Sequence, residues 1–368
     1  MTQGGSLSPA RDTVAPSDCM SSPMPSTMPS PMTSASPAGR HARPKPVYAA
    51  LDLGTNNCRL LIARPVPGGF RILDAFSRIV RLGEGLSGSG RLGEAAIART
   101  IAALRICRNK MEARQVNRFR LIATEACRAA ENGCDFIARV QQETGLGLEI
   151  VDRETEAHLA AAGCAALADP DAKSIVLFDI GGGSSELVLL KAGQGELRER
   201  VGAWASLPLG VVSLAEKHGG HQVTRAMFEA MVDEVAIALE PFRARVKSDA
   251  LCDNFHLLGT SGTVTTIAGV HLGLERYDRR KVDGLWMENQ EIDAILSSLL
   301  EMSYAQRAAN ACIGPERADL VLAGCAILEA IRRAFPAKRL RIADRGLREG
   351  ILMDLMVEDG WRVNGARS

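Results

Sequence analysis

The sequence predicts an α/β protein made of two similar halves with a cleft between them. From residue 47 onward, short apolar runs typical of strands alternate with stretches whose apolar residues have helical spacing. A strand, an Asp-x-Gly turn and a second strand occur at residue 52 and again at residue 179. The 368 residues are 46% hydrophobic and 24% charged, which is typical of a globular protein of about two domains.

Charge and hydropathy exclude several classes of function. The chain has 44 Lys and Arg against 43 Asp and Glu, so we expect no nucleic-acid partner, because an overall basic field is absent. No apolar stretch approaches the ~20 residues of a membrane span, so we expect no membrane association. The N-terminus lacks the apolar core of a secretory signal, and the cysteines form no CxxC pair. We therefore expect a cytoplasmic protein.

Residues 1–46 differ in composition from the rest of the chain. They hold nine of the 16 prolines, nine serines and no aromatic residue. Such a segment buries too little apolar surface to offset the entropy of ordering it. We therefore predict a disordered tail over residues 1–46.

The first half alternates strands with helices. The Val-, Ile- and Leu-containing runs predict strands over 48–53, 59–64, 70–76, 79–82, 118–123 and 148–151. The spacing of Ile97, Ile101 and Leu104 predicts a helix over 95–111, and a short helix is expected around 126–131.

The second half repeats this alternation. Strands are predicted over 174–178, 186–190, 255–258 and 340–343, and the first two of them are joined by a glycine turn. Helices are predicted over 154–167, 224–246, 264–270, 290–302, 315–334 and 346–356.

The two Asp-x-Gly turns are the first candidate binding elements. Asp52-Leu-Gly54-Thr55-Asn56 resembles Asp179-Ile-Gly181-Gly182-Gly183, and each sequence joins two apolar runs. Glycine lets backbone N–H groups approach an anion such as phosphate, and a strand-end carboxylate supplies an oxygen for Mg²⁺. Two such hairpins facing each other would hold a phosphate chain from both sides. The alternative is that each is only a tight hairpin whose Asp bonds locally.

A third loop, Leu258-Gly259-Thr260-Ser261-Gly262-Thr263, connects a predicted strand to a predicted helix. A small polar loop that opens a helix favours anion binding, because free N–H groups and the helix dipole point into it. The alternative is an ordinary N-cap turn. Together the three loops predict the following phosphate-binding residues: Gly54, Thr55, Asn56, Gly181, Gly182, Gly183, Ser184, Gly259, Ser261 and Gly262.

Seven segments of the chain resemble one known family. They are Tyr48–Asn57, Ala123–Arg128, Glu156–Gly163, Phe178–Leu187, Leu207–Leu214, Leu258–Thr263 and Asp344–Gly350. Their order is that of the exopolyphosphatase / guanosine pentaphosphate phosphohydrolase (Ppx/GppA) family, and the resemblance covers nearly all of 47–358. The chain resembles the short members, which lack a C-terminal HD-like domain.

The resemblance implies two RNase-H-like domains of the actin, sugar-kinase and Hsp70 superfamily, with the active site in the cleft between them. The first domain would comprise 47–157 together with a C-terminal helix at about 346–368. The second would comprise 158–345.

The resemblance also implies roles for single residues. Glu156 matches the carboxylate that activates the attacking water, and Arg128 matches an arginine that contacts the substrate phosphate. Asp179 and Glu186 match acids associated with metal and catalysis, and Asp52 matches the acid of the first hairpin, so all three are predicted to position Mg²⁺. Two positions depart from the family pattern: Thr155 replaces a frequent acid, and Arg345 stands where a small residue is more common.

These features together predict a Mg²⁺-dependent hydrolase that releases orthophosphate from the end of inorganic polyphosphate. The alternative within the class is removal of the 5′-phosphate of guanosine pentaphosphate (pppGpp). Two hypotheses from other functional classes remain open: the protein is a small-molecule kinase, or it is a non-catalytic sensor of polyphosphate or nucleotide. A homodimer is also left open.

Overall fold

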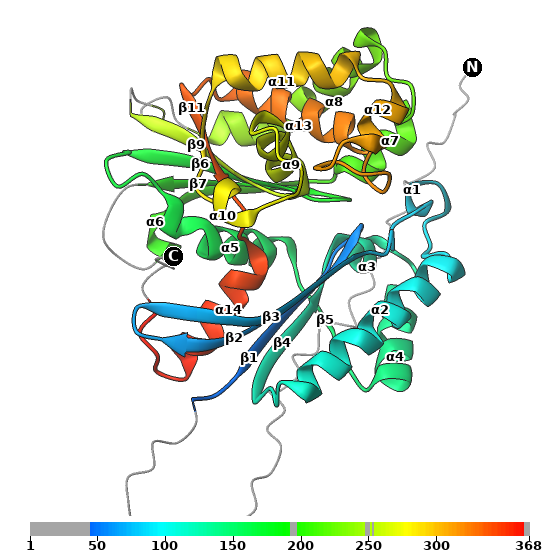
Figure 1. Cartoon of the computed structure of the whole chain (residues 1–368), viewed down its shortest axis with the longest axis vertical. Coiled ribbons are helices and arrows are strands. Elements are labelled where there is room, and N and C mark those ends of the chain that lie inside the picture. Colours follow the sequence, from blue (N-terminus) through cyan, green and yellow to red (C-terminus); the bar gives the residue numbers. More distant parts are fainter. Residues whose placement is uncertain (1–44, 192–196, 247–250, 252–253, 364–368) are drawn as a thin grey trace, which may run out of the picture. The chain divides into compact units, whose positions relative to one another are not determined.

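The structure is a computed structural model that describes residues 45–191, 197–246, 251 and 254–363 (Figure 1). These residues belong to one compact unit, Ala42–Ser368. The predicted disordered tail lies outside the described residues except for Lys45 and Pro46.

The first of two sheets has five strands in the order β3-β2-β1-β4-β5. Neighbours among β1, β2 and β3 are antiparallel, whereas β4 runs parallel to β1 and β5 runs parallel to β4. The strands are β1 (Tyr48–Leu53), β2 (Asn57–Val66), β3 (Gly69–Ile79), β4 (Arg118–Ala123) and β5 (Glu149–Ile150).

The second sheet has six strands in the order β10-β11-β9-β6-β7-β8. They are β6 (Ser174–Ile180), β7 (Ser185–Lys191), β8 (Val201–Leu207), β9 (Phe255–Thr260), β10 (Trp286–Glu288) and β11 (Arg339–Ala343). The run β8-β7-β6-β9-β11 has the same strand directions as β3-β2-β1-β4-β5, with three antiparallel strands followed by two parallel ones. The predicted similarity of the two halves is therefore confirmed at the level of topology.

Helices connect the strands. In the first half they are α1 (Leu86–Ser89), α2 (Glu94–Ala113), α3 (Glu125–Ala129), α4 (Gly133–Thr144) and α5 (Arg153–Cys164), which continues into a 3₁₀ turn at Ala165–Leu167. In the second half they are α6 (Leu197–Arg200), α7 (Val211–His218), α8 (Arg225–Arg245), α9 (Gly262–His271), α10 (Arg279–Val282), α11 (Asn289–Glu301), α12 (Tyr304–Ala309), α13 (Val321–Ala334) and α14 (Leu347–Glu358).

Most predicted elements are confirmed, with three kinds of difference. Helices α1, α4, α6, α7, α10 and α12 and strands β8 and β10 were not predicted. The strand predicted over 70–76 is the longer strand β3, which tolerates polar residues at 77 and 78 because it is the edge strand of its sheet. The strand predicted over 79–82 is wrong, since β3 ends at Ile79 and residues 80–82 lie outside any strand. Helix α13 begins at Val321 rather than at 315, because residues 315–320 form turns, one of them closed by the Leu320 N–H on the Arg317 carbonyl.

The alternation of side chains decides where each strand-end aspartate points. On β1, Ala49, Leu51 and Leu53 pack against α2 and α4, whereas Tyr48 and Ala50 pack against α14. Asp52 therefore lies on the α14 face of the first sheet, since successive strand residues alternate between faces.

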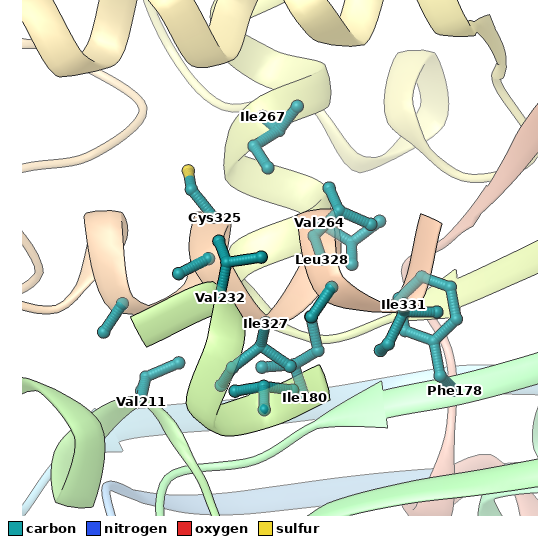
Figure 2. Close-up of a cluster of buried hydrophobic side chains, with 14 of the residues drawn as sticks. Phe178, Ile180, Val211, Val232, Val264, Ile267, Cys325, Ile327, Leu328 and Ile331 are labelled. Atoms are coloured by element: carbon teal, nitrogen blue, oxygen red, sulfur yellow. The ribbon is translucent and has the colours of Figure 1, made fainter. Parts of the chain in front are cut away.

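The second sheet obeys the same alternation. Val176, Phe178 and Ile180 of β6 belong to the large cluster with α8, α9 and α13, part of which is drawn in Figure 2. Ile175 and Leu177 face the other way and pack with residues of α5. Asp179 shares that second face, so both aspartates point toward the layer formed by α5 and α14, which lies between the two sheets in Figure 1.

Helices α5 and α14 approach each other through glycine. A Cβ atom on Gly163 would lie 1.9 Å from the Gly346 carbonyl oxygen, and one on Gly350 would lie 2.0 Å from the Leu159 carbonyl oxygen. Any larger residue at either position would push the two helices apart. This close crossing fixes α5 against α14, and the first turn of α5 carries Glu156.

Two further observations concern membrane-spanning helices and the cysteines. Among the described residues, no helix has both the length and the apolar character that crossing a bilayer requires. Free, buried thiols are found at Cys58, Cys107, Cys127, Cys164, Cys312 and Cys325.

Candidate active site

The two predicted hairpins meet face to face. A Cβ atom on Gly182 would lie 2.9 Å from the Thr55 Cβ and 3.1 Å from the Asn56 backbone nitrogen. A Cβ atom on Gly183 would lie 2.7 Å from the Thr55 hydroxyl oxygen. Glycine at both positions therefore allows the second hairpin to approach the backbone of the first.

The register of the two hairpins creates two equivalent cross-strand pairs. Asp52 of β1 lies opposite Arg59 of β2, and Asp179 of β6 lies opposite Glu186 of β7. The first pair joins opposite charges, whereas the second places two carboxylates side by side, an arrangement that is unfavourable without a cation. The duplicated topology thus carries two different chemistries.

One cavity collects most of the predicted site. Its lining includes parts of both hairpins, the first turn of α5 and the loop before α9. The predicted residues that line it are Asp52, Gly54, Thr55, Asn56, Glu156, Asp179, Gly181, Gly182, Gly183, Ser184, Glu186, Ser261 and Gly262. A second cavity of about 660 Å³ shares Asp52, Arg59, Asp179 and Arg317 with the first, so the two lie side by side.

Two predicted residues are placed elsewhere. Gly259 lies inside strand β9, where a Cβ atom would meet the Phe178 ring at 2.6 Å, so it is a packing position within the sheet. Arg128 does not line the cavity but lies behind Glu156, and its guanidinium is occupied by protein acceptors. Ser261 lines the cavity and also caps α9, since its hydroxyl oxygen accepts the N–H groups of Thr263 and Val264.

Glu156 is a buried carboxyl in the cavity wall. The side chain of Asp152 caps α5 by accepting the Thr155 N–H at 2.7 Å, which places Glu156 in the first turn. Burial, followed by the negative charge of Glu186, raises the pKa of Glu156 well above its usual range, while Arg128 opposes the rise. A carboxyl with a raised pKa is a better base toward water than an exposed one.

The paired acids of the second hairpin have perturbed pKa values as well. Burial raises the pKa of Asp179 to about 7, with Arg59 opposing the rise, and burial raises that of Glu186 to about 7. Burial also raises the pKa of Asp52, while Arg59 and Arg348 oppose the rise. The shifts share two physical causes: burial disfavours the charged form of each carboxyl, and neighbouring carboxylates add to the rise.

Sequence reasoning missed two arginines of the cavity. A Cβ atom on Gly262 would lie 3.8 Å from the guanidinium groups of both Arg59 and Arg317. Within the described residues, neither guanidinium has a hydrogen-bond acceptor or an ion-pair partner. Burial lowers the pKa of Arg317, and the nearby charge of Arg59 lowers it further. Two adjacent unpaired cations favour an anion between or beside them.

Only one of these arginines left a signal in the sequence. Arg59 stands in the first hairpin where Glu186 stands in the second, so aligning the two repeats would have drawn attention to it. Arg317 lies in a turn that belongs to no repeat and no motif. Glu125, another lining residue that was missed, accepts hydrogen bonds from Arg128 and Arg153.

The oxygen atoms of the cavity fit a hard divalent cation. The side-chain oxygens of Asn56 and Asn57 are buried without a hydrogen-bond partner in the described structure, and Asp179 and Glu186 stand side by side. No group of three or more His, Cys, Asp or Glu in the described part of the chain is arranged as a ready metal cage. Such a donor set suits Mg²⁺, which is commonly held by one or two carboxylates, water and substrate phosphates.

The sequence model of the Ppx/GppA phosphatase family matches residues 61–359 of this chain. The chain belongs to this family. The predicted family is thereby confirmed, and with it the predicted enzyme class, a phosphoanhydride hydrolase.

Three relatives illustrate the extent of similarity within the Ppx/GppA family. The chain is 29% identical over 326 residues to Exopolyphosphatase 2 of Mycobacterium tuberculosis, covering 83% of this chain and 98% of that protein. It is 28% identical over 315 residues to the guanosine-5′-triphosphate,3′-diphosphate pyrophosphatase of Aeromonas hydrophila, covering 84% of this chain and 60% of that protein. The crystal structure of the Aquifex aeolicus family member matches with a TM-score of 0.70 and 28% identity, over 86% of this chain and 99% of that one.

The structural match confirms the predicted fold class of two RNase-H-like domains in the actin-like superfamily. The boundary between the domains at residues 157 and 158 stays a prediction. It falls inside α5, which contacts α14 as well as strands β7 and β8 of the second sheet.

Proposed function

We propose that this chain hydrolyses the terminal phosphoanhydride bond of inorganic polyphosphate and releases orthophosphate. The observation that carries the proposal is the placement of Glu156. Its buried carboxyl lies in the wall of a cavity that is lined by two glycine hairpins and by the unpaired guanidinium groups of Arg59 and Arg317. The relative that the chain matches over 98% of its length bears the name exopolyphosphatase.

The residues of the cavity have complementary tasks in this reaction. The backbone N–H groups of the hairpins and the two arginines would hold the phosphate chain. Glu156 would take a proton from a water molecule as that water attacks the terminal phosphorus. The bond from this phosphorus to its bridging oxygen would then break, leaving orthophosphate and a chain one phosphate shorter. Positioning and charge neutralisation would supply most of the rate acceleration.

Mg²⁺ would be held by the neighbouring carboxylates of Asp179 and Glu186, with Asp52 and the side-chain oxygens of Asn56 and Asn57 as further donors. When bound, the ion neutralises phosphate charge and polarises the phosphoryl oxygens. Arg128 would act one step away from the substrate, by orienting Glu156.

Removal of the 5′-phosphate of pppGpp is the second candidate. It involves the same bond type, and a family relative named for guanosine-5′-triphosphate,3′-diphosphate supports it. The cavity of about 660 Å³ next to the proposed reaction site also supports it, because this volume would accommodate a group larger than phosphate, such as a nucleoside.

Isotope labelling tests the proposal. The full chain is incubated with Mg²⁺ and either long-chain polyphosphate or pppGpp in water enriched in ¹⁸O. We expect orthophosphate carrying one ¹⁸O atom, released from chain ends, and the ratio of the two rates names the main substrate. Transfer of the terminal phosphoryl group to an added acceptor, without release of orthophosphate, would indicate a kinase instead. Tight binding of polyphosphate by folded protein with no release would indicate a sensor.

A further inference from the structure

Arg81 is the residue that connects the first glycine hairpin with the loop that carries Arg317. It follows strand β3 and has a backbone φ of 47°, a left-handed conformation that costs energy in a residue other than glycine. Such a conformation persists only when the surroundings hold it in place. The contacts of its main chain and side chain explain what holds it.

The main chain of this segment is bonded to the first hairpin. The N–H groups of Val80 and Arg81 both donate to the Asn56 carbonyl oxygen, at 2.9 and 3.1 Å, and the Gly83 N–H donates to the Thr55 carbonyl oxygen at 2.9 Å. Thr55 and Asn56 line the cavity. The position of Arg81 is therefore tied to the phosphate-binding turn itself.

The side chain of Arg81 extends to the other half of the protein. Its two terminal nitrogens donate to both carboxylate oxygens of Asp319, at 2.9 and 3.0 Å, and one of them also donates to the Glu316 carbonyl oxygen at 3.0 Å. Arg317 lies between these two acceptors in the sequence. The turn is closed by the Leu320 N–H on the Arg317 carbonyl oxygen at 2.9 Å.

We propose that Arg81 is a positioning residue that holds the Arg317 guanidinium in the cavity by bracing the 316–319 turn against the first hairpin. This role rests on one part of the proposed function, namely that Arg317 binds a phosphate group of the substrate. A guanidinium suits the task because its planar fork bonds a carboxylate through two parallel hydrogen bonds and still reaches a carbonyl oxygen. The side chain of Arg81 is about one-third exposed, so its ion pair alone contributes little to folding stability.

The test measures binding without turnover. The probe is imidodiphosphate, whose P–N–P bridge resists hydrolysis, added with Mg²⁺ to the full chain and followed by calorimetry. We expect Arg81→Ala and Asp319→Asn each to raise the Kd about tenfold, the scale of one lost hydrogen bond to a charged group. Arg91→Ala is the matched control, because Arg91 pairs with Glu131 on the exposed surface and should change the Kd less than about twofold.

A double-variant comparison separates positioning from a general structural role. In an Arg317→Ala background, Arg81→Ala should add less than about twofold, because the residue that it positions is already gone. Arg81→Lys should recover part of the affinity, since a single ammonium keeps the charge but not the fork.

The outcomes that overturn the proposal are equally concrete. It fails if Arg81→Ala leaves the Kd unchanged, if its effect persists in full without Arg317, or if wild-type protein does not bind imidodiphosphate. Far-UV circular dichroism and the melting temperature confirm that each variant folds. If the wild type binds the probe but releases no phosphate from any substrate, the proposed hydrolysis fails, while the binding comparison still decides the role of Arg81.

Discussion

The guanidinium of Arg128 donates to the carboxylate of Glu156 across a distance of 3.0 Å. The same group also bonds Glu125 at 2.6 Å and the Val151 carbonyl oxygen at 2.5 Å. Arg128 thus connects α3 to the first turn of α5, and its guanidinium makes four hydrogen bonds to protein acceptors. The geometry makes it a holder of the Glu156 carboxyl rather than a direct ligand of phosphate.

Replacing Glu156 by Gln should reduce kcat by about 10²–10⁴-fold, the usual contribution of a general base. The amide keeps the shape of the side chain but cannot accept a proton. Glu154→Gln is the matched control, because Glu154 lies in the same helical turn but is exposed and should leave kcat nearly unchanged. Equal activity of Glu156→Gln and wild type, both folded, would remove Glu156 from the mechanism.

Replacing Arg128 by Gln should move the acid limb of the kcat–pH profile to higher pH. The positive charge of Arg128 lowers the pKa of Glu156, so its loss raises that pKa, and the base is then deprotonated only at higher pH. The measurement is a pH–rate profile with saturating substrate. A uniform drop at every pH, without a shift of the limb, would argue that Arg128 affects the rate by another route.

Mg²⁺ binding should release protons and weaken as the pH falls below about 7, because Asp179 and Glu186 have a pKa of about 7 and must lose their protons to bind the ion. Calorimetric titration in two buffers with different ionisation enthalpies counts the protons released. Asp179→Asn should reduce the count. A proton count of zero at pH 6.5 would contradict the assignment of these carboxyls to the metal.

The same two carboxyls make stability depend on pH when no divalent cation is present. Their pKa is about 7 in the folded chain and about 4 in an unfolded chain, so the folded state holds more protons between these values. Their contribution to stability is complete below about pH 4 and is lost as the pH rises through about 7. We expect the melting temperature of Asp179→Asn to fall less over this range than that of the wild type, both measured in EDTA. Parallel curves for the two proteins would refute the shift.

Gly182→Ala should damage the site where the two hairpins meet. The added Cβ atom would lie 2.9 Å from the Thr55 Cβ and 3.1 Å from the Asn56 nitrogen, so the hairpins must separate. We expect a loss of about 1–3 kcal/mol in unfolding free energy, as for other overpacked positions, together with a large loss of activity. Gly88→Ala is the control, because nothing lies within 4 Å of its Cβ position. Chemical denaturation and the phosphate-release assay measure both effects.

Local patterns were enough to predict much of the fold. The apolar runs at β1 and β6 and the turns that follow them were recognisable because each depends on residues close in sequence. Strand β8 and helix α7 were missed, since β8 owes its strand form to pairing with β7 rather than to its own composition.

Gly259 illustrates the corresponding limit at the site. Its sequence neighbours resemble an anion-binding loop, yet Gly259 lies inside strand β9. The ring of Phe178 on the neighbouring strand leaves no room for a side chain there, and only the tertiary structure shows this contact. A glycine motif predicts a backbone conformation and a close approach, not which partner makes that approach.

The sequence by itself determined the α/β class and the repeated hairpins with Asp52 and Asp179, because local apolar patterning and residue chemistry are written along the chain. Glu156 and Glu186 were singled out only through the resemblance to the Ppx/GppA family. Tertiary structure alone decided that Arg128 supports Glu156 from behind and that Arg59 and Arg317, far apart in sequence, share one cavity. The physical reason is that electrostatic interactions act over a few ångströms of space. Which charges come that close depends on how the sheets and helices pack.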